Sequence, residues 1–438
     1  MRSLRLLIAK EFRELMASRA YWLLLLLTGP LVGQAFITAV NLYAEASGRG
    51  GQPAALAQGL SPLDGILAPT FGAYDIAVTL LFPFVAIRLI SAEKESGALK
   101  LMLQSPPGML SILAAKGITL VAGWLIAWLP GLIALVLWTA YGGSLYAPEL
   151  ANLLFGHLLR VILGSGVAVA AAAVATGAAS AAIATLAFTV GTWALDFVAA
   201  GRGGVLQKLA AYTPTAALRT FEQGQLRLSI VIVSLLAGLA GFAIAGVWLP
   251  TRRDLRARLT GSFAVLVVFG LVAWTGSLAR ASWDLSENRR NSFAPAEEAA
   301  LRHIRQPLRV TIYLAAEDPR LMDLDRSVLS KLQRILPQVD IGYAAQGRTG
   351  LFSGATDHYG EVWYELDGRK VMSRSTTEPI VLDTLFKLAE IQPPRQSEAN
   401  GFSGHPLGAD PTGAWLVFYM LWPLGIGLLW WREFRYSS

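Results

Sequence analysis

The chain has 438 residues, of which 54% are hydrophobic and only 15% are charged, against about 25% charged in an ordinary soluble protein. This composition excludes a disordered chain, a coiled coil and a typical cytosolic enzyme. There is no cysteine, which excludes disulfides, thiol catalysis, iron–sulfur clusters and thiolate metal sites.

The net charge of +7 is unevenly distributed. Residues 281–412 carry 15 Lys and Arg against 18 Asp and Glu, whereas the rest carries 22 against 12. The basic residues therefore belong to the apolar part, where they flank long apolar runs. This pattern is typical of membrane topology and differs from the basic face of a nucleic-acid-binding protein.

The apolar runs predict a polytopic α-helical membrane protein, because a helix needs ~20 apolar residues to cross the hydrocarbon core. Val161–Leu195 has no charged residue and is too long for one span, so we interpret it as two helices joined at Gly177–Ser180. The alternative, one long helix, would reverse the orientation of everything after it. The eight predicted spans are 20–42, 73–91, 112–138, 152–175, 181–200, 228–249, 259–280 and 413–431.

Lys and Arg in the short loops predict the orientation. With the N-terminus in the cytoplasm, fifteen basic residues fall on the cytoplasmic side and six in the outer loops. The positive-inside rule then places both termini, including the tail 432–438, in the cytoplasm and residues 281–412 outside it. Glu11 and Glu14 precede a first run that is too long for a cleavable signal peptide.

Residues 1–19 are amphipathic, with apolar residues three or four positions apart and charges between them. Such a helix lies in the membrane interface. It serves either as a topology anchor or, through Lys10, Glu11 and Phe12, as a contact for a cytoplasmic partner.

The loop 88–107 follows the second span and joins a charged triplet to a short apolar helix and a Ser-Pro stop. This order, within the six-span block 20–258, resembles the permease subunits of type 2 ABC exporters. The resemblance implies a coupling helix docked on a separate ATPase, with Glu93, Lys94, Glu95, Gly97 and Leu99 as transmission contacts. The alternative is an ordinary solvated loop.

The same resemblance implies partners and location. We expect two ATPase subunits, which bind the ATP and Mg, and a second permease copy in a homodimer within the bacterial inner membrane. No cofactor is expected in this chain.

Two further segments extend the resemblance. Pro214, Phe221 and Gly224 precede the sixth span and are similar to gliding-motility (GldF-like) permeases; the alternative is an interfacial re-entrant turn. Trp283–Phe293, followed by an Ala/Glu-rich helix and the strand Leu308–Leu314, looks like the start of a GldG-like auxiliary protein. This resemblance implies a GldG-like part that is fused to the permease and shortened, and we expect that family's second, larger domain to be missing.

Residues 281–391 predict an extracytoplasmic α/β domain, followed by a linker over 392–412. The expected order is β-α-β and then β-β-α, which is thioredoxin-like, with a type I′ hairpin at Asp367-Gly368. A thioredoxin enzyme needs a reactive thiol, so we expect a scaffold, with a periplasmic protein as its possible partner.

The sequence offers no catalytic constellation. No Gly-Lys dipeptide occurs, so there is no P-loop, and the four His are scattered. We expect neither an enzyme nor a nucleic-acid or metal site.

Ionisable residues within spans point to function. Asp75, Arg160 and Asp196, with His157 near Arg160, are predicted in the outer halves of their helices. They could pair, line an outer vestibule, or reach to the headgroups. The sequence thus favours the membrane subunit of an ABC exporter; the alternative is a non-transporting anchor or sensor that presents the outer domain to a partner.

Overall fold

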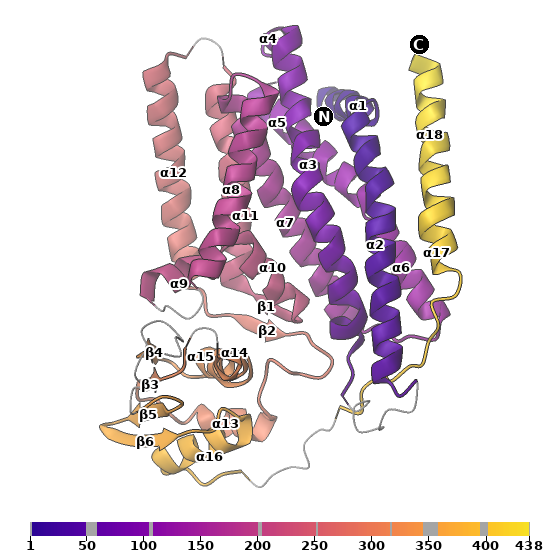
Figure 1. Ribbon diagram of the computed structural model, residues 1–438. Coiled ribbons are helices and arrows are strands. Elements are labelled where there is room, and N and C mark those ends of the chain that lie inside the picture. Colours follow the sequence, from indigo (N-terminus) through magenta and orange to yellow (C-terminus); the bar gives the residue numbers. More distant parts are fainter. Residues whose placement is uncertain are drawn as a thin grey trace, which may run out of the picture. The chain divides into compact units, whose positions relative to one another are not determined.

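The computed structural model describes residues 2–49, 59–104, 108–199, 204–250, 253–315, 318–344, 358–394 and 402–437. The chain forms two compact units (Figure 1). The helical unit comprises Met1–Gly191, Leu228–Ala279 and Ser403–Ser438. The mixed unit comprises Thr192–Arg227 and Arg280–Phe402.

Eight helices among the described residues are long and apolar enough to cross a membrane. This confirms the predicted number of spans. The uncharged stretch breaks after Val174 and resumes at Ala178, so its interpretation as two helices is also confirmed. The spanning elements are α2 (Arg19–Ala46), η2 with α3 (Leu63–Leu67, Ala68–Ser96), α5 with α6 (Met109–Ala127, Leu129–Ala140), α7 (Ala147–Val174), α8 (Ala178–Ala199), α11 (Leu228–Trp248), α12 (Leu255–Ser277) and α17 with η4 and α18 (Ala414–Leu416, Val417–Leu421, Trp422–Ser437).

Two short helices belong to one end of the helical unit. The predicted amphipathic segment forms α1 (Arg2–Met16), which lies across the ends of the spanning helices, and α4 (Ala98–Met102) follows α3 (Figure 1). The C-terminal turns of α18 reach the same end. The chain leaves the helical unit after α12 and returns to it before α17, both at the opposite end (Figure 1). With eight candidate spans, the N- and C-termini therefore lie at the same end.

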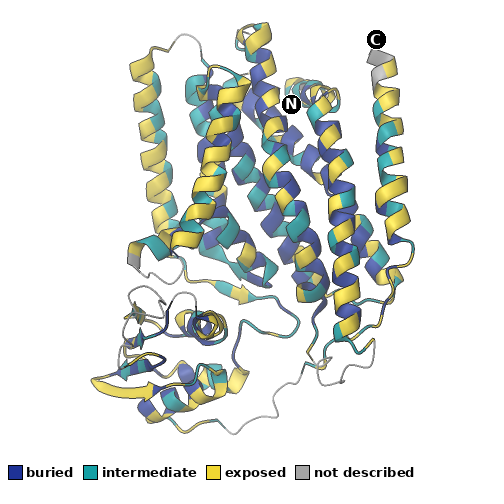
Figure 2. Ribbon diagram, viewed as in Figure 1, coloured by how far each residue is buried: buried dark blue, intermediate teal, exposed yellow. Residues whose placement is uncertain are grey.

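Glycines allow the closest helix contacts in the helical unit. A Cβ on Gly166 of α7 would lie 2.1 Å from the carbonyl oxygen of Gly238 on α11. Likewise, Gly33 of α2 lies against Phe418 of η4. Small residues of this kind let helix backbones approach within a membrane. About half of the apolar stretch in each of α2, α3 and α7 is buried, whereas α12 has no buried residue (Figure 2).

The mixed unit contains a four-stranded sheet of order β4-β3-β5-β6. Strand β3 pairs in parallel with β4 and antiparallel with β5, which pairs antiparallel with β6. Asp367 and Gly368, at φ 52° and 77°, form the hairpin turn with two positive φ angles that the sequence predicted. The strands are β3 (Leu308–Ile312), β4 (Val339–Tyr343), β5 (Val362–Leu366) and β6 (Arg369–Ser373).

Helices cover the buried face of this sheet. On β3, Leu308, Val310 and Ile312 are buried while Arg309 between them is exposed, which is the alternation of a half-covered strand. The core also takes side chains from the helices. The remaining elements of the unit are α9 (Gly204–Ala210), α10 (Pro214–Glu222), β1 (Gln225–Arg227), β2 (Ser282–Asp284), α13 (Pro295–Leu301), α14 (Pro319–Leu324), η3 (Asp325–Leu329), α15 (Ser330–Ile335) and α16 (Glu378–Leu388).

The second half of the predicted linker is bonded to the helical unit. The hydroxyl of Tyr43 donates to the His405 carbonyl at 2.8 Å, and Arg49 pairs with Asp410 at 2.8 Å. The sequence predicted a linker over 392–412, and these contacts hold its residues 403–412 against the end of α2. Residues 395–401 of that linker lie outside the described residues.

Candidate functional site

Four charged side chains meet where α1, α3 and α5 converge. Lys116 on α5 and Glu11 on α1 are both fully buried, and the Lys116 Nζ lies 2.8 Å from Glu11 Oε2 and 2.8 Å from Glu93 Oε2. Lys116 also donates to the Leu89 carbonyl at 2.8 Å. On the other side of the cluster, Lys10 forms ion pairs with Glu11 and Glu93.

This four-charge cluster (Lys10, Glu11, Glu93 and Lys116) balances two acids against two bases. Burial lowers the pKa of Lys10, but its hydrogen bond with Glu93 and the Glu11 charge outweigh burial and raise the pKa above its ordinary value. Burial raises the pKa of Glu11, which the Lys116 charge partly offsets. Lone buried charges are costly, whereas paired and hydrogen-bonded ones are tolerated. The cluster therefore ties the interfacial helix to the end of α3.

Carboxylate oxygens of Glu11, Glu14 and Glu93 lie close enough together to hold a cation. The Lys10 ammonium already fills that role, because it pairs with all three carboxylates. The three carboxylates therefore have a cationic partner within the chain itself.

Lys94 joins the end of α3 to α7. Its Nζ donates to the carbonyls of Ala172, Ala173 and Ala175, at 3.0, 3.1 and 2.7 Å. The last carbonyls of a helix have no partner within the helix, and a cation there also suits the negative end of the helix dipole. Lys94 therefore caps α7 instead of projecting from the loop.

The chain turns at Gly97, whose φ of 76° ends α3 in the left-handed conformation that glycine adopts without strain. The next helix, α4, buries Leu99 against the helical core and exposes Leu101, which is 72% accessible. Glu95 and Lys100 are also exposed. The predicted Ser-Pro stop at 105–107 lies outside the described residues.

Three residues expected as contacts for a partner, Glu93, Lys94 and Leu99, make contacts within the helical unit. Of the predicted set, Glu95 is the exposed charged residue. Phe12 of α1 is partly buried against the core, so it too packs inward.

Sequence reasoning missed Lys116, which it counted only as a loop charge. The signal was available, since Lys116 is the one charged residue within α5. An ionisable residue inside an apolar helix usually has a specific partner.

The intramembrane candidates divide between the two units. Arg160 on α7 pairs with Asp75 on α3 at 3.1 Å and donates to Thr79 at 3.0 Å. Asp196 does not join them and pairs instead with Arg219 of the mixed unit, at 3.4 Å. Pairing was one of the alternatives that the sequence left open, and the structure favours it for Asp75 and Arg160.

His157, one turn before Arg160, lies in an aromatic cluster. Its ring centroid is 5.9 Å from that of Tyr74 and 6.4 Å from that of Trp128. All three side chains are buried, and within the described part of the chain His157 Nε2, the Tyr74 hydroxyl and Trp128 Nε1 have no hydrogen-bond partner.

In the mixed unit, the structure brings together the two segments that extended the family resemblance. Strand β1 follows α10 directly and pairs antiparallel with β2, so that Gln225–Arg227 lies beside Ser282–Asp284. The Gly224 carbonyl accepts from the Leu285 amide at 2.8 Å. Pro214 begins α10, and Phe221 is 1% exposed at its end.

The hydrogen bonds of this junction come from the Trp283–Phe293 segment. Arg290 and Asn291 donate to the Gln223 carbonyl, at 3.1 and 2.8 Å. The Asp284 carboxylate accepts a hydrogen bond from the backbone amide of Asn291 at 3.0 Å and another from the Ser292 hydroxyl at 2.8 Å. The segment before α11 is thus part of the mixed unit, although the sequence interpretation placed it in the permease block.

The comparisons with known proteins fit this architecture. The family model of the ABC-2 family transporter proteins matches residues 5–255, which is more than half of the chain. No curated protein and no solved structure matches. Members of the family are transport components of the membrane and generally pair with an ABC ATPase. With its eight candidate spans, this chain is a multi-pass membrane protein and belongs to the ABC-2 transporter family, as a transmembrane permease subunit.

Proposed function

We propose that this permease works as an exporter driven by a separate ATPase that docks on the exposed face of residues 95–104. One observation carries the proposal: the loop is joined to three helices by charged contacts, through Glu93 to α1 and α5 and through Lys94 to α7. A solvated connector needs no buried ion pairs. A loop joined in this way would transmit a push on its exposed side to the spanning helices.

The docking surface consists of Glu95, Lys100, Leu101 and Gln104, all exposed. An exposed leucine between charges is typical of a contact that buries one apolar anchor within a polar rim. By this proposal, Glu93, Lys94 and Leu99 keep the loop in place, and the four exposed side chains meet the ATPase.

The working assembly would contain two permease chains and two ATPases, which bind the ATP and Mg. Symmetric oligomers are the usual solution for one type of subunit. In the bacterial inner membrane, the end with α1 and α4 would face the cytoplasm together with both termini. Residues 281–412 would then be periplasmic, since they follow the seventh span.

For the mixed unit we propose a thioredoxin-like scaffold of GldG-like origin, fused to a GldF-like permease. The strand order β4-β3-β5-β6, with only β5 antiparallel to the others, supports this fold. A chain without cysteine has no thiol for redox exchange, so its role would be to bind or recruit a periplasmic protein.

The test is to look for an ABC ATPase gene beside the gene of this chain, and to co-purify its product with the permease. We expect Leu101→Asp to abolish binding and the stimulation of ATP hydrolysis. The matched control is Met322→Asp in the mixed unit, because Met322 is 70% exposed and Leu101 is 72% exposed. This change should leave both binding and stimulation unchanged. If the unmodified chain binds no ATPase, the result would contradict the proposal and favour the alternative, a non-transporting anchor or sensor.

A further inference from the structure

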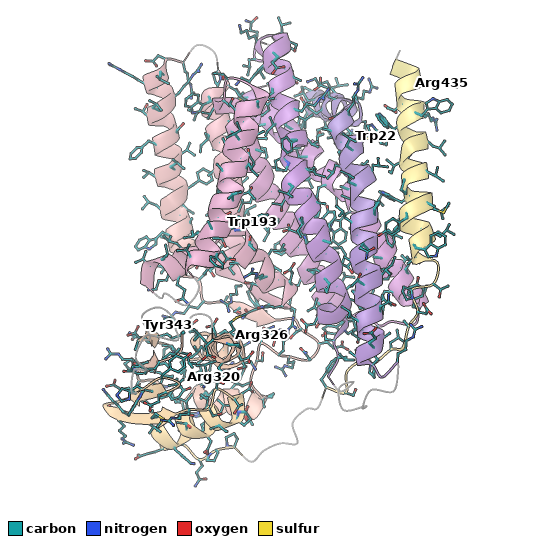
Figure 3. All side chains as sticks on the ribbon, viewed as in Figure 1. Trp22, Trp193, Arg320, Arg326, Tyr343 and Arg435 are labelled. Atoms are coloured by element: carbon teal, nitrogen blue, oxygen red, sulfur yellow. The ribbon has the colours of Figure 1, made fainter. Side chains whose placement is uncertain are left out.

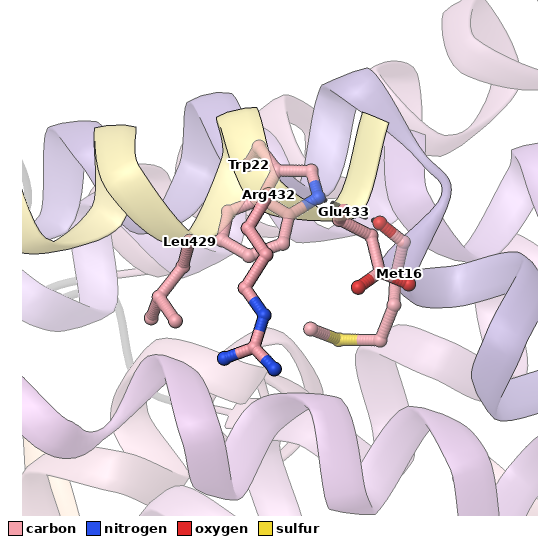
Figure 4. A pocket seen from close by; sticks show the side chains of 5 residues that line it. All are labelled: Met16, Trp22, Leu429, Arg432 and Glu433. Carbon is pink, nitrogen blue, oxygen red and sulfur yellow. Dashed lines mark hydrogen bonds between the residues drawn. The ribbon is translucent and has the colours of Figure 1, made fainter. Parts of the chain in front are cut away.

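A pocket lies between the C-terminal span and the junction of α1 with α2. It is lined by Met16, Trp22, Leu429, Arg432 and Glu433, and its volume is about 480 Å³ (Figure 4). Trp22 and Arg435 mark the same end of the helical unit (Figure 3). The C-terminal span lies outside the region that matches the permease family.

The packing of the helices explains why a pocket forms here. Trp422 and Phe418 fit against Gly29 and Gly33, so the C-terminal span contacts α2 closely in that region. The part of α2 before Gly29 contains no glycine, and Leu429 of α18 remains 53% exposed. The Trp22 indole donates to the Met16 carbonyl at 2.6 Å, which fixes the corner between α1 and α2 as one wall.

The two charges of the pocket are available to a ligand. Within the described residues, neither Arg432 nor Glu433 forms an ion pair, whereas the next arginine, Arg435, stacks over Trp431 at 4.3 Å. Figure 4 shows the Arg432 guanidinium projecting into the pocket between Leu429 and Met16. The pocket thus presents one cation and one anion beside apolar side chains.

This chemistry selects a ligand. A guanidinium binds phosphate through a planar fork of donors, and a carboxylate accepts hydrogen bonds from an ammonium group. The pocket has no net charge to attract a free anion. Its place, at the end of a span and beside an interfacial helix, is the depth of lipid headgroups. We propose that the pocket binds a zwitterionic phospholipid with a primary ammonium, its phosphate on Arg432 and its ammonium on Glu433.

The experiment uses the full-length chain, extracted in detergent, and native mass spectrometry with phosphatidylethanolamine, phosphatidylcholine and phosphatidylglycerol. We expect phosphatidylethanolamine to be retained best, because its ammonium donates hydrogen bonds that a trimethylammonium lacks. Arg432→Ala should lower its retention about tenfold. Glu433→Gln should shift the preference towards phosphatidylglycerol, since the remaining site would be cationic.

Two variants separate this site from general lipid binding. Leu429→Trp fills the pocket without changing charge and should also reduce retention, whereas Arg435→Ala removes a cation outside it and should not. Equal losses in Arg432→Ala and Arg435→Ala would overturn the proposal. Equal retention of phosphatidylglycerol and phosphatidylethanolamine by the unmodified chain would also overturn it.

Discussion

Lys116 is the residue on which the four-charge cluster depends. It is fully buried and pairs with both Glu11 and Glu93, so Lys116→Met would leave two buried carboxylates with Lys10 as their remaining partner. Removing one partner of a buried ion pair typically costs about 3–5 kcal/mol, because it leaves an uncompensated charge. We expect a clearly lower melting temperature for the detergent-solubilised chain. Lys100→Met, an exposed change in α4, is the control and should have little effect.

Two buried tyrosines with different surroundings predict opposite effects of the same substitution. The Tyr74 hydroxyl has no partner among the described residues, whereas that of Tyr21 donates to the Gly123 carbonyl at 2.8 Å. Removing an unpaired buried hydroxyl should be neutral or stabilising, and removing a bonded one should cost about 1 kcal/mol. Thermal unfolding of Tyr74→Phe and Tyr21→Phe would compare them. Destabilisation by Tyr74→Phe would mean that this hydroxyl has a bonded partner.

At the scale of elements, the sequence predicted those features that depend on local pattern. Apolar runs predicted the eight spans, and the Asp-Gly pair predicted the β5–β6 turn, because both are determined by neighbouring residues. It could not predict pairings between distant segments. Glu93 is buried beside Lys116, which lies on another helix. Asn291 donates hydrogen bonds both to Asp284 and to the carbonyl of the distant Gln223. Such contacts are determined by tertiary packing, which no periodicity records.

The junction between α10 and β2 gives a prediction at this scale. Gly224 has a φ of 76°, and a Cβ there would lie 2.8 Å from Ser286 Cβ. Gly368 has nearly the same φ, 77°, but nothing within 4 Å. The left-handed conformation alone costs a non-glycine residue roughly 1–2 kcal/mol. Gly224→Ala should therefore destabilise the mixed unit more than Gly368→Ala, as measured by limited proteolysis of the full chain. Equal destabilisation by the two substitutions would show that Ser286 can move away from the new Cβ without a cost in stability.

For the whole molecule, the number of spans predicts on which sides of the membrane the surfaces around Leu101 and Met322 lie. Five candidate spans, from Met109–Ala140 to Leu255–Ser277, separate Leu101 from Met322. If all five cross the membrane, these residues lie on opposite sides of it. By the positive-inside rule, we expect the Leu101 side to be cytoplasmic.

The absence of cysteine makes this orientation directly testable, since each single-cysteine variant carries one reactive thiol. Leu101→Cys and Met322→Cys place it at positions that are 72% and 70% exposed. A membrane-impermeant maleimide added to intact spheroplasts should label Met322→Cys at once, and Leu101→Cys only after the membrane is permeabilised. Labelling of both in intact cells would contradict the odd number of crossings. The reverse labelling pattern would leave the fold unchanged but reverse its orientation in the membrane. The surface around Leu101 would then lie outside the cytoplasm, where no ATPase could dock on it.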